Sequence, residues 1–203
     1  MVTFSTLFSI IIGLPIGILL HATSSEETGG IKPKPLLSSV LSRIVNALMS
    51  FPFIILIIVL MPLSRLILGT SIGTKATIIP LSIAAAPFVG RIVETSLKEV
   101  DTGVIQDSKA MGSTNWQIIT KVLLPEALPS LVSGLTLTII NIIGYSAMAG
   151  AIGGGGLGDL AIRYGYQRFR PAYLVCAVIV LLVLVEVIQY VGNKIADRLL
   201  AKR

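Results

Sequence analysis

Blocks of apolar residues long enough to cross a lipid bilayer are the feature that most constrains how this chain folds. A transmembrane helix needs about 20 mainly apolar residues. Five such blocks lie at 1–20, 46–68, 76–93, 128–152 and 172–192. Because a bilayer offers no water to backbone polar groups, segments of this length cross it as helices. We therefore expect an all-α membrane protein with about five transmembrane helices.

The composition argues against several other classes of protein. The 203 residues are 54% hydrophobic and 13% charged, too little charge to cover the surface of a soluble domain. The charges behind the net +6 flank the apolar blocks, which indicates membrane topology and not nucleic-acid binding. With one cysteine, Cys176, and one histidine, His21, no internal disulfide and no metal site built from Cys and His ligands is expected.

Lysines and arginines predict the orientation of the spans, because cytoplasmic loops carry more of them. Five spans put the larger group on the cytoplasmic side: Lys32, Lys34, Arg43, Arg91, Lys98, Lys109, Lys121, Lys194, Arg198, Lys202 and Arg203. The smaller, outer group is Arg65, Lys75, Arg163, Arg168 and Arg170. The N-terminus is thus expected outside, and the 94–127 loop and a 196–203 tail in the cytoplasm. Residues 1–195 would form the transmembrane domain.

Local patterns predict further details of the spans. No basic segment precedes the first block, so we expect a spanning helix there and not a cleavable signal peptide. Arg91 and Glu94 stand three residues apart at the end of the third block and are expected to pair. Prolines within the blocks are expected to bend the helices. These are Pro52, Pro62, Pro80 and Pro87.

Two glycine-rich stretches resemble nucleotide-binding motifs but lack their context. The GxGxxG pattern within 150–158 follows a membrane span and not a β-strand, so we interpret it as a flexible or closely packed helix end. In 69–75 the spacing is too short for a P-loop, and the lysine does not follow a glycine. With His21 as the only histidine, an enzyme is not expected either.

Polar residues in the fourth block indicate a possible solute path. Asn141, Tyr145 and Met148 recur at helical i, i+4, i+7 spacing and therefore share a face, and Ser146 lies beside them. Such residues line a solute path or make hydrogen bonds between helices, and both interpretations stay open. Met148 ends this polar face, which leads to the hypothesis that it helps to close the path.

The loop from Val100 to Pro129 carries the strongest signal. Ser113-Thr114-Asn115 offers helix N-cap side chains directly after Gly112, so a short helix is predicted on each side of this glycine. Ile105, Ala110 and Met111 would give the first helix an apolar face exposed on the cytoplasmic side. Such a face is buried in a partner's groove or on the lipid surface.

This loop resembles the EAA motif of ABC importer permeases: Glu-Ala-Ala, a glycine four residues after the last alanine, and a later Ile-x-Leu-Pro. Residues 106–108 stand at Glu-Ala-Ala, Gly112 at the glycine, and 122–125 at Ile-x-Leu-Pro. The resemblance implies that the helix before Gly112 docks into a cleft on a cytoplasmic ATPase subunit. The residues it assigns to this coupling are Gln106, Asp107, Ser108, Ala110, Met111, Gly112, Leu124 and Pro125.

Segments along most of the chain resemble one subfamily, the methionine importer permeases. They are 13–17, 50–54, 69–73, 85–88, 91–94, 121–129, 144–150, 153–158 and 164–169. The chain departs from the family in three places. Gln106 replaces the acid of the motif, and Met49 stands where relatives usually carry Arg. The chain is also expected to lack a stretch of the family's N-terminus before the first span, which itself is expected to lack its first turns.

The subfamily implies a type I importer permease in the bacterial cytoplasmic membrane. It would form a homodimer with the solute path at the two-fold axis. An ABC ATPase dimer on the cytoplasmic side would bind ATP and Mg²⁺, so this chain itself is expected to bind no cofactor. An extracytoplasmic methionine-binding protein or lipoprotein would deliver the solute. A permease for another amino acid or osmolyte, an ATP-independent secondary carrier and a structural membrane subunit stay open as alternatives.

Overall fold

The computed structural model describes residues 1–25 and 29–201, and all regular structure in these ranges is helical. Four helices are long and apolar enough to cross a membrane: α1 (Val2–Thr23), α4 (Ile78–Lys98), α8 (Leu128–Gly150) and α10 (Pro171–Leu200). Helices α2 (Pro35–Met49) and α3 (Phe53–Leu68) are apolar enough only as a bent pair, which fits either a fifth, broken span or a re-entrant loop. The remaining elements are α5 (Thr102–Ala110), α6 (Asn115–Gln117), π-helical η2 (Ile118–Leu123), α7 (Leu124–Glu126), α9 (Gly156–Asp159) and π-helical η3 (Leu160–Tyr166). The expected all-α class is confirmed.

The second predicted span is not the continuous helix expected over 46–68. Helix α2 begins at Pro35, eleven residues earlier, and the chain bends by 98° between α2 and α3. Pro52 stands immediately before α3 and has no N–H with which to continue the helix from α2. The first part of α2 contains three serines, at 38, 39 and 42, and Arg43, which lower its hydropathy. The apolar residues alone therefore did not predict that the helix begins at Pro35. Pro62 and Pro87, in contrast, lie inside α3 and α4 as predicted.

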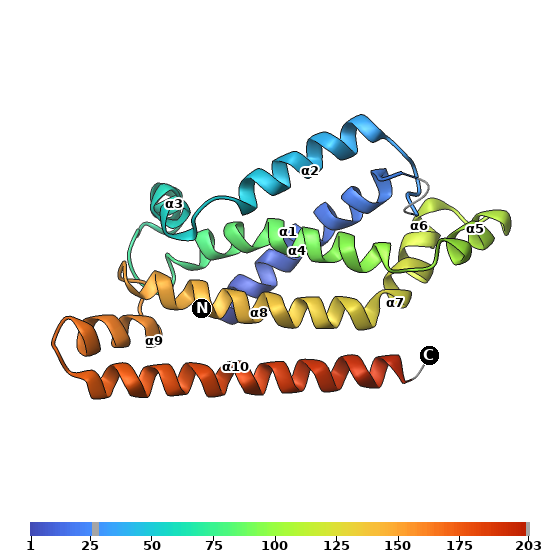
Figure 1. The fold of residues 1–203 in the computed structure, drawn as a ribbon. Helices are drawn as coiled ribbons and strands as arrows, with labels where there is room; N and C mark the ends of the chain where they lie inside the picture. The colour runs from blue at the N-terminus through green and yellow to red at the C-terminus, as the bar shows by residue number, and fades with distance from the viewer. Residues whose placement is uncertain (26–28, 202–203) are drawn as a thin grey trace.

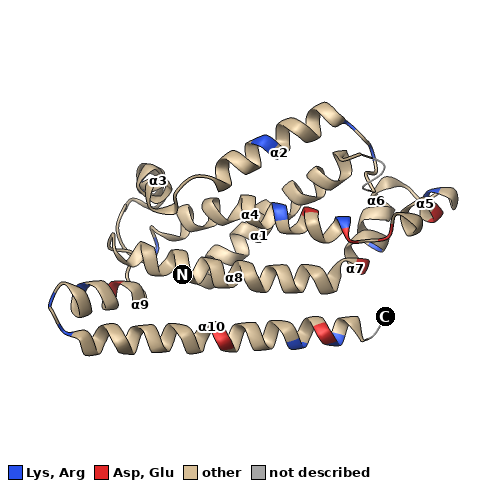
Figure 2. Ribbon diagram, in the orientation of Figure 1, with Lys and Arg blue, Asp and Glu red and all other residues tan. Residues whose placement is uncertain are grey.

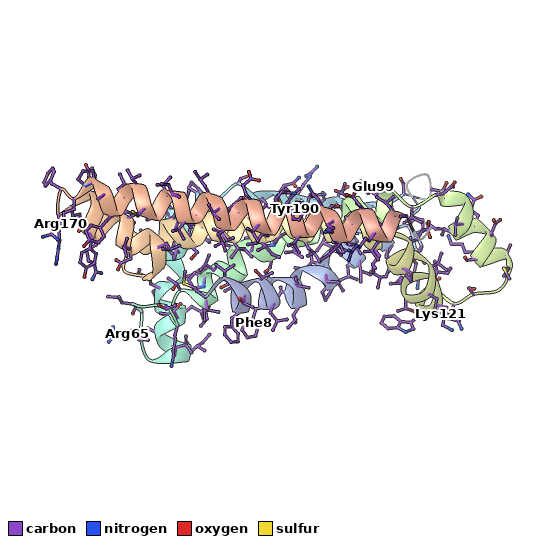
Figure 3. All side chains as sticks on the ribbon, turned by 90° about the horizontal axis from the view of Figure 1, so that it is seen from below. Phe8, Arg65, Glu99, Lys121, Arg170 and Tyr190 are labelled. Carbon is purple, nitrogen blue, oxygen red and sulfur yellow. The ribbon has the colours of Figure 1, made fainter. Side chains whose placement is uncertain are left out.

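The loops predicted for the two sides of the membrane lie at opposite ends of the molecule. The C-terminal end of α1, the N-terminal end of α2, α5, α6 and the C-terminal end of α10 gather at one end, and α3 and α9 at the other (Figure 1). Charged residues are concentrated towards these ends (Figure 2). Figure 3 shows Arg65 and Arg170 at one end and Glu99 and Lys121 at the other. Helix α10 continues without a break through 196–200, and Lys202 and Arg203 lie outside the described residues.

Helices α1 and α4 cross at very close range, and glycine permits this. A Cβ atom on Gly17 would lie 2.5 Å from the carbonyl oxygen of Gly90, and one on Gly13 would lie 2.6 Å from that of Ala86. Glycines four residues apart let two membrane helices bring their backbones together. The sequence analysis used the 13–17 segment only as a family resemblance, so its packing role is a finding of the structure.

The glycine-rich segment 150–158 packs closely. Of the two predicted interpretations, a flexible or a closely packed helix end, the structure shows the second. A Cβ atom on Gly158 would collide with the carbonyl oxygen of Ala147, and one on Gly150 with the backbone of α9. The second glycine-rich stretch packs against the first, because the N–H of Gly73 donates to the carbonyl oxygen of Gly153 over 3.1 Å. Both stretches therefore serve to join α3, α8 and α9.

Candidate functional site

Helix α5 is short, and side chains and backbone bonds define both of its ends. Asp101 precedes the helix, and its Oδ1 accepts a hydrogen bond of 2.7 Å from the N–H of Gly103. Only residues 99–101 separate α5 from the end of the spanning helix α4. A helix of nine residues is marginal alone in water, so capping and packing must hold it. We call residues 101–117 the α5–α6 segment.

Gly112 ends α5 in a Schellman motif. The N–H of Ser113 donates to the carbonyl oxygen of Ser108 over 3.1 Å, and that of Gly112 donates to Lys109 over 3.0 Å. This pair of bonds requires a left-handed backbone after the helix, and Gly112 has φ +79°. A Cβ atom at Gly112 would meet nothing within 4 Å. The glycine is therefore required by backbone conformation and not by lack of space.

Helix α6 begins with the N-cap predicted after Gly112. The side chain of Thr114 accepts from the N–H of Gln117 over 3.4 Å, and the side chain of Gln117 accepts from the N–H of Thr114 over 2.9 Å. This reciprocal arrangement is a capping box. The predicted pair of short helices on either side of Gly112 is confirmed.

Gly112→Ala should loosen this turn without a steric clash. Forcing an L-residue into the left-handed region costs about 1–2 kcal/mol. We expect the amides of Gly112 and Ser113 to exchange with solvent about 5- to 30-fold faster, as measured by hydrogen–deuterium exchange. Gly112→Asn is the control, because asparagine tolerates this backbone region and should give a smaller change. Equal exchange in the glycine and alanine proteins would contradict the assignment.

The apolar residues of the α5–α6 segment divide between two sides, which corrects one prediction. Ile105 is 2% exposed and belongs to the chain's own core with Ile118 and Leu123. Ala110 and Met111 are exposed. At about 100° per residue, position 110 lies roughly 140° around the helix from position 105, so the three cannot form one face. Ile105 anchors the segment to the bundle, and the other two point away from it.

Two large apolar residues of this segment are exposed. Met111 is 87% exposed and Trp116 is 73% exposed, and we call these two residues the apolar tip. Large apolar residues exposed at the end of a molecule are typical of a docking surface for another protein.

The other residues of the predicted coupling set are mostly accessible. Gln106, Asp107, Gly112 and Pro125 are exposed, while Ser108 and Leu124 are half-buried. The hydroxyl of Ser108 donates to the carbonyl oxygen of Val104 over 2.7 Å, so it bonds within its own helix. Gln106 and Lys109 line a hollow of about 230 Å³ against Gly29 and Gly30. The segment thus holds six of the eight predicted coupling residues, and the other two, Leu124 and Pro125, belong to α7.

A charged cluster ties α2 to the end of α4 that leads into this segment. The predicted Arg91–Glu94 pair is present, with Nη1 and Oε2 2.5 Å apart, and Lys98 Nζ lies 2.7 Å from the other oxygen of Glu94. Nη2 of Arg91 also donates to the side chains of Asn46 (2.5 Å) and Ser42 (3.0 Å) on α2. Arginine can do this because its guanidinium presents several donors in a fixed plane. Sequence spacing predicted the pair but gave no signal for its partners on α2.

The predicted polar face of α8 is partly accessible. Asn141 and Met148 are exposed, as is Gly144 between them. Tyr145 borders this face and stacks on Phe53 of α3, with ring centroids 4.4 Å apart and an angle of 8° between the planes. Ser146 lies about 140° around the helix from Asn141 and belongs to a different side. We call Asn141, Gly144 and Met148 the open face of α8.

His21 and Cys176 form no metal centre within the described residues. No group of three His, Cys, Asp or Glu side chains comes together there as metal ligands would. His21 is 1% exposed, and neither ring nitrogen forms a hydrogen bond with the described part of the chain. Cys176 is a free, exposed thiol on α10.

Comparison with known proteins gives matches that span nearly the whole chain. Residues 6–199 match the family described as binding-protein-dependent transport system inner membrane component. The probable D-methionine transport system permease protein MetI of Vibrio cholerae is 46% identical over 187 residues, covering 92% of this chain and 82% of that protein. Its namesake in Pasteurella multocida is 47% identical over 194 residues, covering 96% and 88%. A chain of the solved, inward-facing MetNI methionine ABC transporter superposes with a TM-score of 0.92 at 46% identity, covering 96% and 89%.

Proposed function

Because this chain belongs to the family of binding-protein-dependent transport system inner membrane components, we propose that it is the permease subunit of an ABC importer for methionine. It has the all-helical fold of a type I importer permease. Methionine as the cargo is supported by the names of relatives that are 46–47% identical over more than nine-tenths of this chain.

The observation that carries the proposal is the α5–α6 segment. It follows a spanning helix after three residues, is capped at both ends of α5, and presents Met111 and Trp116 to the outside. A protein that worked alone would expose this apolar tip to water without benefit. We propose that the tip enters a cleft on a cytoplasmic ATPase subunit, which binds ATP and Mg²⁺ and drives the transport cycle.

The open face of α8 supports assembly as a homodimer. Asn141 is an amide exposed in the middle of an apolar helix, and exposure of such a group to lipid is costly. A second copy placed against this face would shield Asn141 from lipid and enclose a polar path between the two subunits. An extracytoplasmic methionine-binding protein would deliver solute to this path in the bacterial cytoplasmic membrane.

Reconstitution tests the proposed function directly. The chain is co-expressed with the ABC ATPase and binding protein of its own organism, and the purified complex is placed in proteoliposomes. We expect labelled methionine to accumulate only with ATP, and unlabelled methionine to compete better than other amino acids or osmolytes. Accumulation without ATP would indicate a secondary carrier instead, and preference for another solute would overturn the choice of methionine.

Met148 ends the open face, and we expect it to help close the path. Met148→Ala removes an unbranched side chain that can fill an irregular gap. In the same proteoliposomes, this variant should raise passive methionine leak without ATP and alter basal ATP hydrolysis. If both stay at the wild-type level in Met148→Ala, Met148 does not close the path.

A further inference from the structure

A small cavity at the break between α2 and α3 lies beside the open face of α8. Its volume is about 40 Å³. Helix α4 contributes Ala84 and Phe88, α3 contributes Phe53, and α8 contributes Tyr145. Met49 and Phe51 also line it and are 39% and 53% exposed, whereas Phe53 is 8% exposed. The cavity therefore combines a buried side chain, Phe53, with exposed residues at the α2–α3 break.

Tyr145 connects this cavity to the open face. It stands next to Gly144 in the chain, one helical turn from both Asn141 and Met148. Its ring lies flat on the ring of Phe53, with the centroids 4.4 Å apart. A solute at the open face would thus meet the stacked Tyr145–Phe53 pair as the wall of an adjacent recess.

The side chains that line the recess suit an apolar, polarisable group, although polar atoms also reach its surface. Its side chains include the aromatic rings of Phe51, Phe53, Phe88 and Tyr145 and the thioether of Met49, and none is charged. Sulfur packs favourably near aromatic rings, often at the ring edge. No charged side chain lines the recess to compensate an ammonium or carboxylate group for its lost hydration.

The size of the recess suits one side chain and not a whole amino acid. Since a water needs roughly 10–15 Å³ of such volume, about 40 Å³ holds about three waters. The methionine side chain has four non-hydrogen atoms beyond its Cα, which is a comparable size. The charged ends of the amino acid would stay outside, near Asn141.

We propose that this recess is the subsite that receives the thioether side chain of the transported amino acid. This inference rests on the proposed function, because the proposed function identifies methionine as the solute. It assigns Phe53, Phe88, Tyr145 and Ala84 to recognition, and of these only Tyr145 was singled out from the sequence.

Photolabelling of the wild-type complex tests the location of the subsite. The probe is photo-methionine, in which a diazirine replaces the thioether. We expect light to attach it to peptides that contain Phe53, Phe88 or Tyr145, and excess methionine to suppress this labelling. Labelling found only in other peptides, or labelling that methionine does not suppress, would overturn the proposal. Failure of the wild-type complex to take up methionine would instead reject the function itself.

Filling the recess tests its role in transport. Ala84→Leu adds three carbons at its wall, and we expect the apparent KM for methionine uptake to rise at least about tenfold, since the side chain loses its place. Ala172→Leu is the matched control, because it adds the same carbons at an exposed position of α10. Recovery of the complex with its ATPase reports folding, and Ala84→Val replaces the leucine variant if that recovery falls. An unchanged KM in a correctly assembled Ala84 variant would overturn the proposal.

A change of solute gives an independent readout. Norleucine replaces the sulfur of methionine with a methylene group and keeps the shape. Because sulfur–aromatic contacts are modest, we expect norleucine to compete about two- to tenfold more weakly than methionine in the wild type. The difference should shrink in Phe88→Leu, which removes a ring from the recess. Equal competition by both solutes in the wild type would contradict the subsite.

Discussion

Met111→Asp is expected to separate the permease from its ATPase. Met111 is 87% exposed at the apolar tip, so its replacement leaves the fold of the chain intact. In the proposed complex the aspartate would be buried in an apolar cleft without a partner, and loss of a central anchor costs about 2–4 kcal/mol. That free energy corresponds to roughly 30-fold or weaker binding. The measurement is recovery of ATPase protein on the tagged permease, followed by ATP-dependent methionine uptake.

A matched control makes this result specific. Phe169 is 89% exposed in the turn before α10, at the other end of the molecule from the α5–α6 segment (Figure 1). Phe169→Asp introduces the same charge at an equally exposed apolar position, and ATPase recovery should stay normal. If Met111→Asp retains the ATPase as well as Phe169→Asp does, the apolar tip is not the docking site.

Gly17→Ala is expected to destabilise the fold strongly. The added Cβ would lie 2.5 Å from both the carbonyl oxygen of Gly90 and Cβ of Val93, so α1 and α4 must separate. Overpacking costs typically about 1–3 kcal/mol, and a contact against backbone has little room to relax. For a chain of this size each kcal/mol lowers the melting temperature by about 2–4 °C. Thermal unfolding of the purified complex in detergent measures the shift.

Gly144→Ala is the same substitution in a different setting. Gly144 also lies within a spanning helix, but a Cβ atom there would meet nothing within 4 Å. Alanine is favoured over glycine in a helix by up to about 1 kcal/mol, and any added contact would be with the second copy proposed to cover the open face, so this variant should lose far less thermal stability than Gly17→Ala. Equal losses of stability in Gly17→Ala and Gly144→Ala would show that close α1–α4 packing is not the cause.

The candidate site was predictable where it depends on neighbours in the chain. Gly112 and Thr114 were identified because a helix end and the next N-cap are local chemistry, and the structure contains both. The Arg91–Glu94 pair followed from helical spacing for the same reason. The prediction that Ile105 shares an exposed face with Ala110 is wrong, because positions 105 and 110 lie about 140° apart around a helix. Simple helix geometry would have separated them.

The aromatic recess was not predictable from the sequence. Tyr145 was named for its place on a polar helix face, but Phe53 and Phe88 look like ordinary apolar residues of two other spans. They come together only in the folded chain. There α3 is bent by 98° relative to α2, and residues of α3, α4 and α8 line the same cavity. No periodicity within one helix encodes such a meeting.

The sequence by itself determined that this chain is a helical membrane protein with a capped segment between two spans. Bilayer-length apolar blocks must form helices, because lipid cannot satisfy backbone hydrogen bonds, and the caps involve residues only a few positions apart. The tertiary structure alone decided the course of the broken second span, the close crossing at Gly13 and Gly17, and the linkage of Arg91 to α2. Each of these depends on which helices face one another, and that is set by packing between residues far apart in the chain.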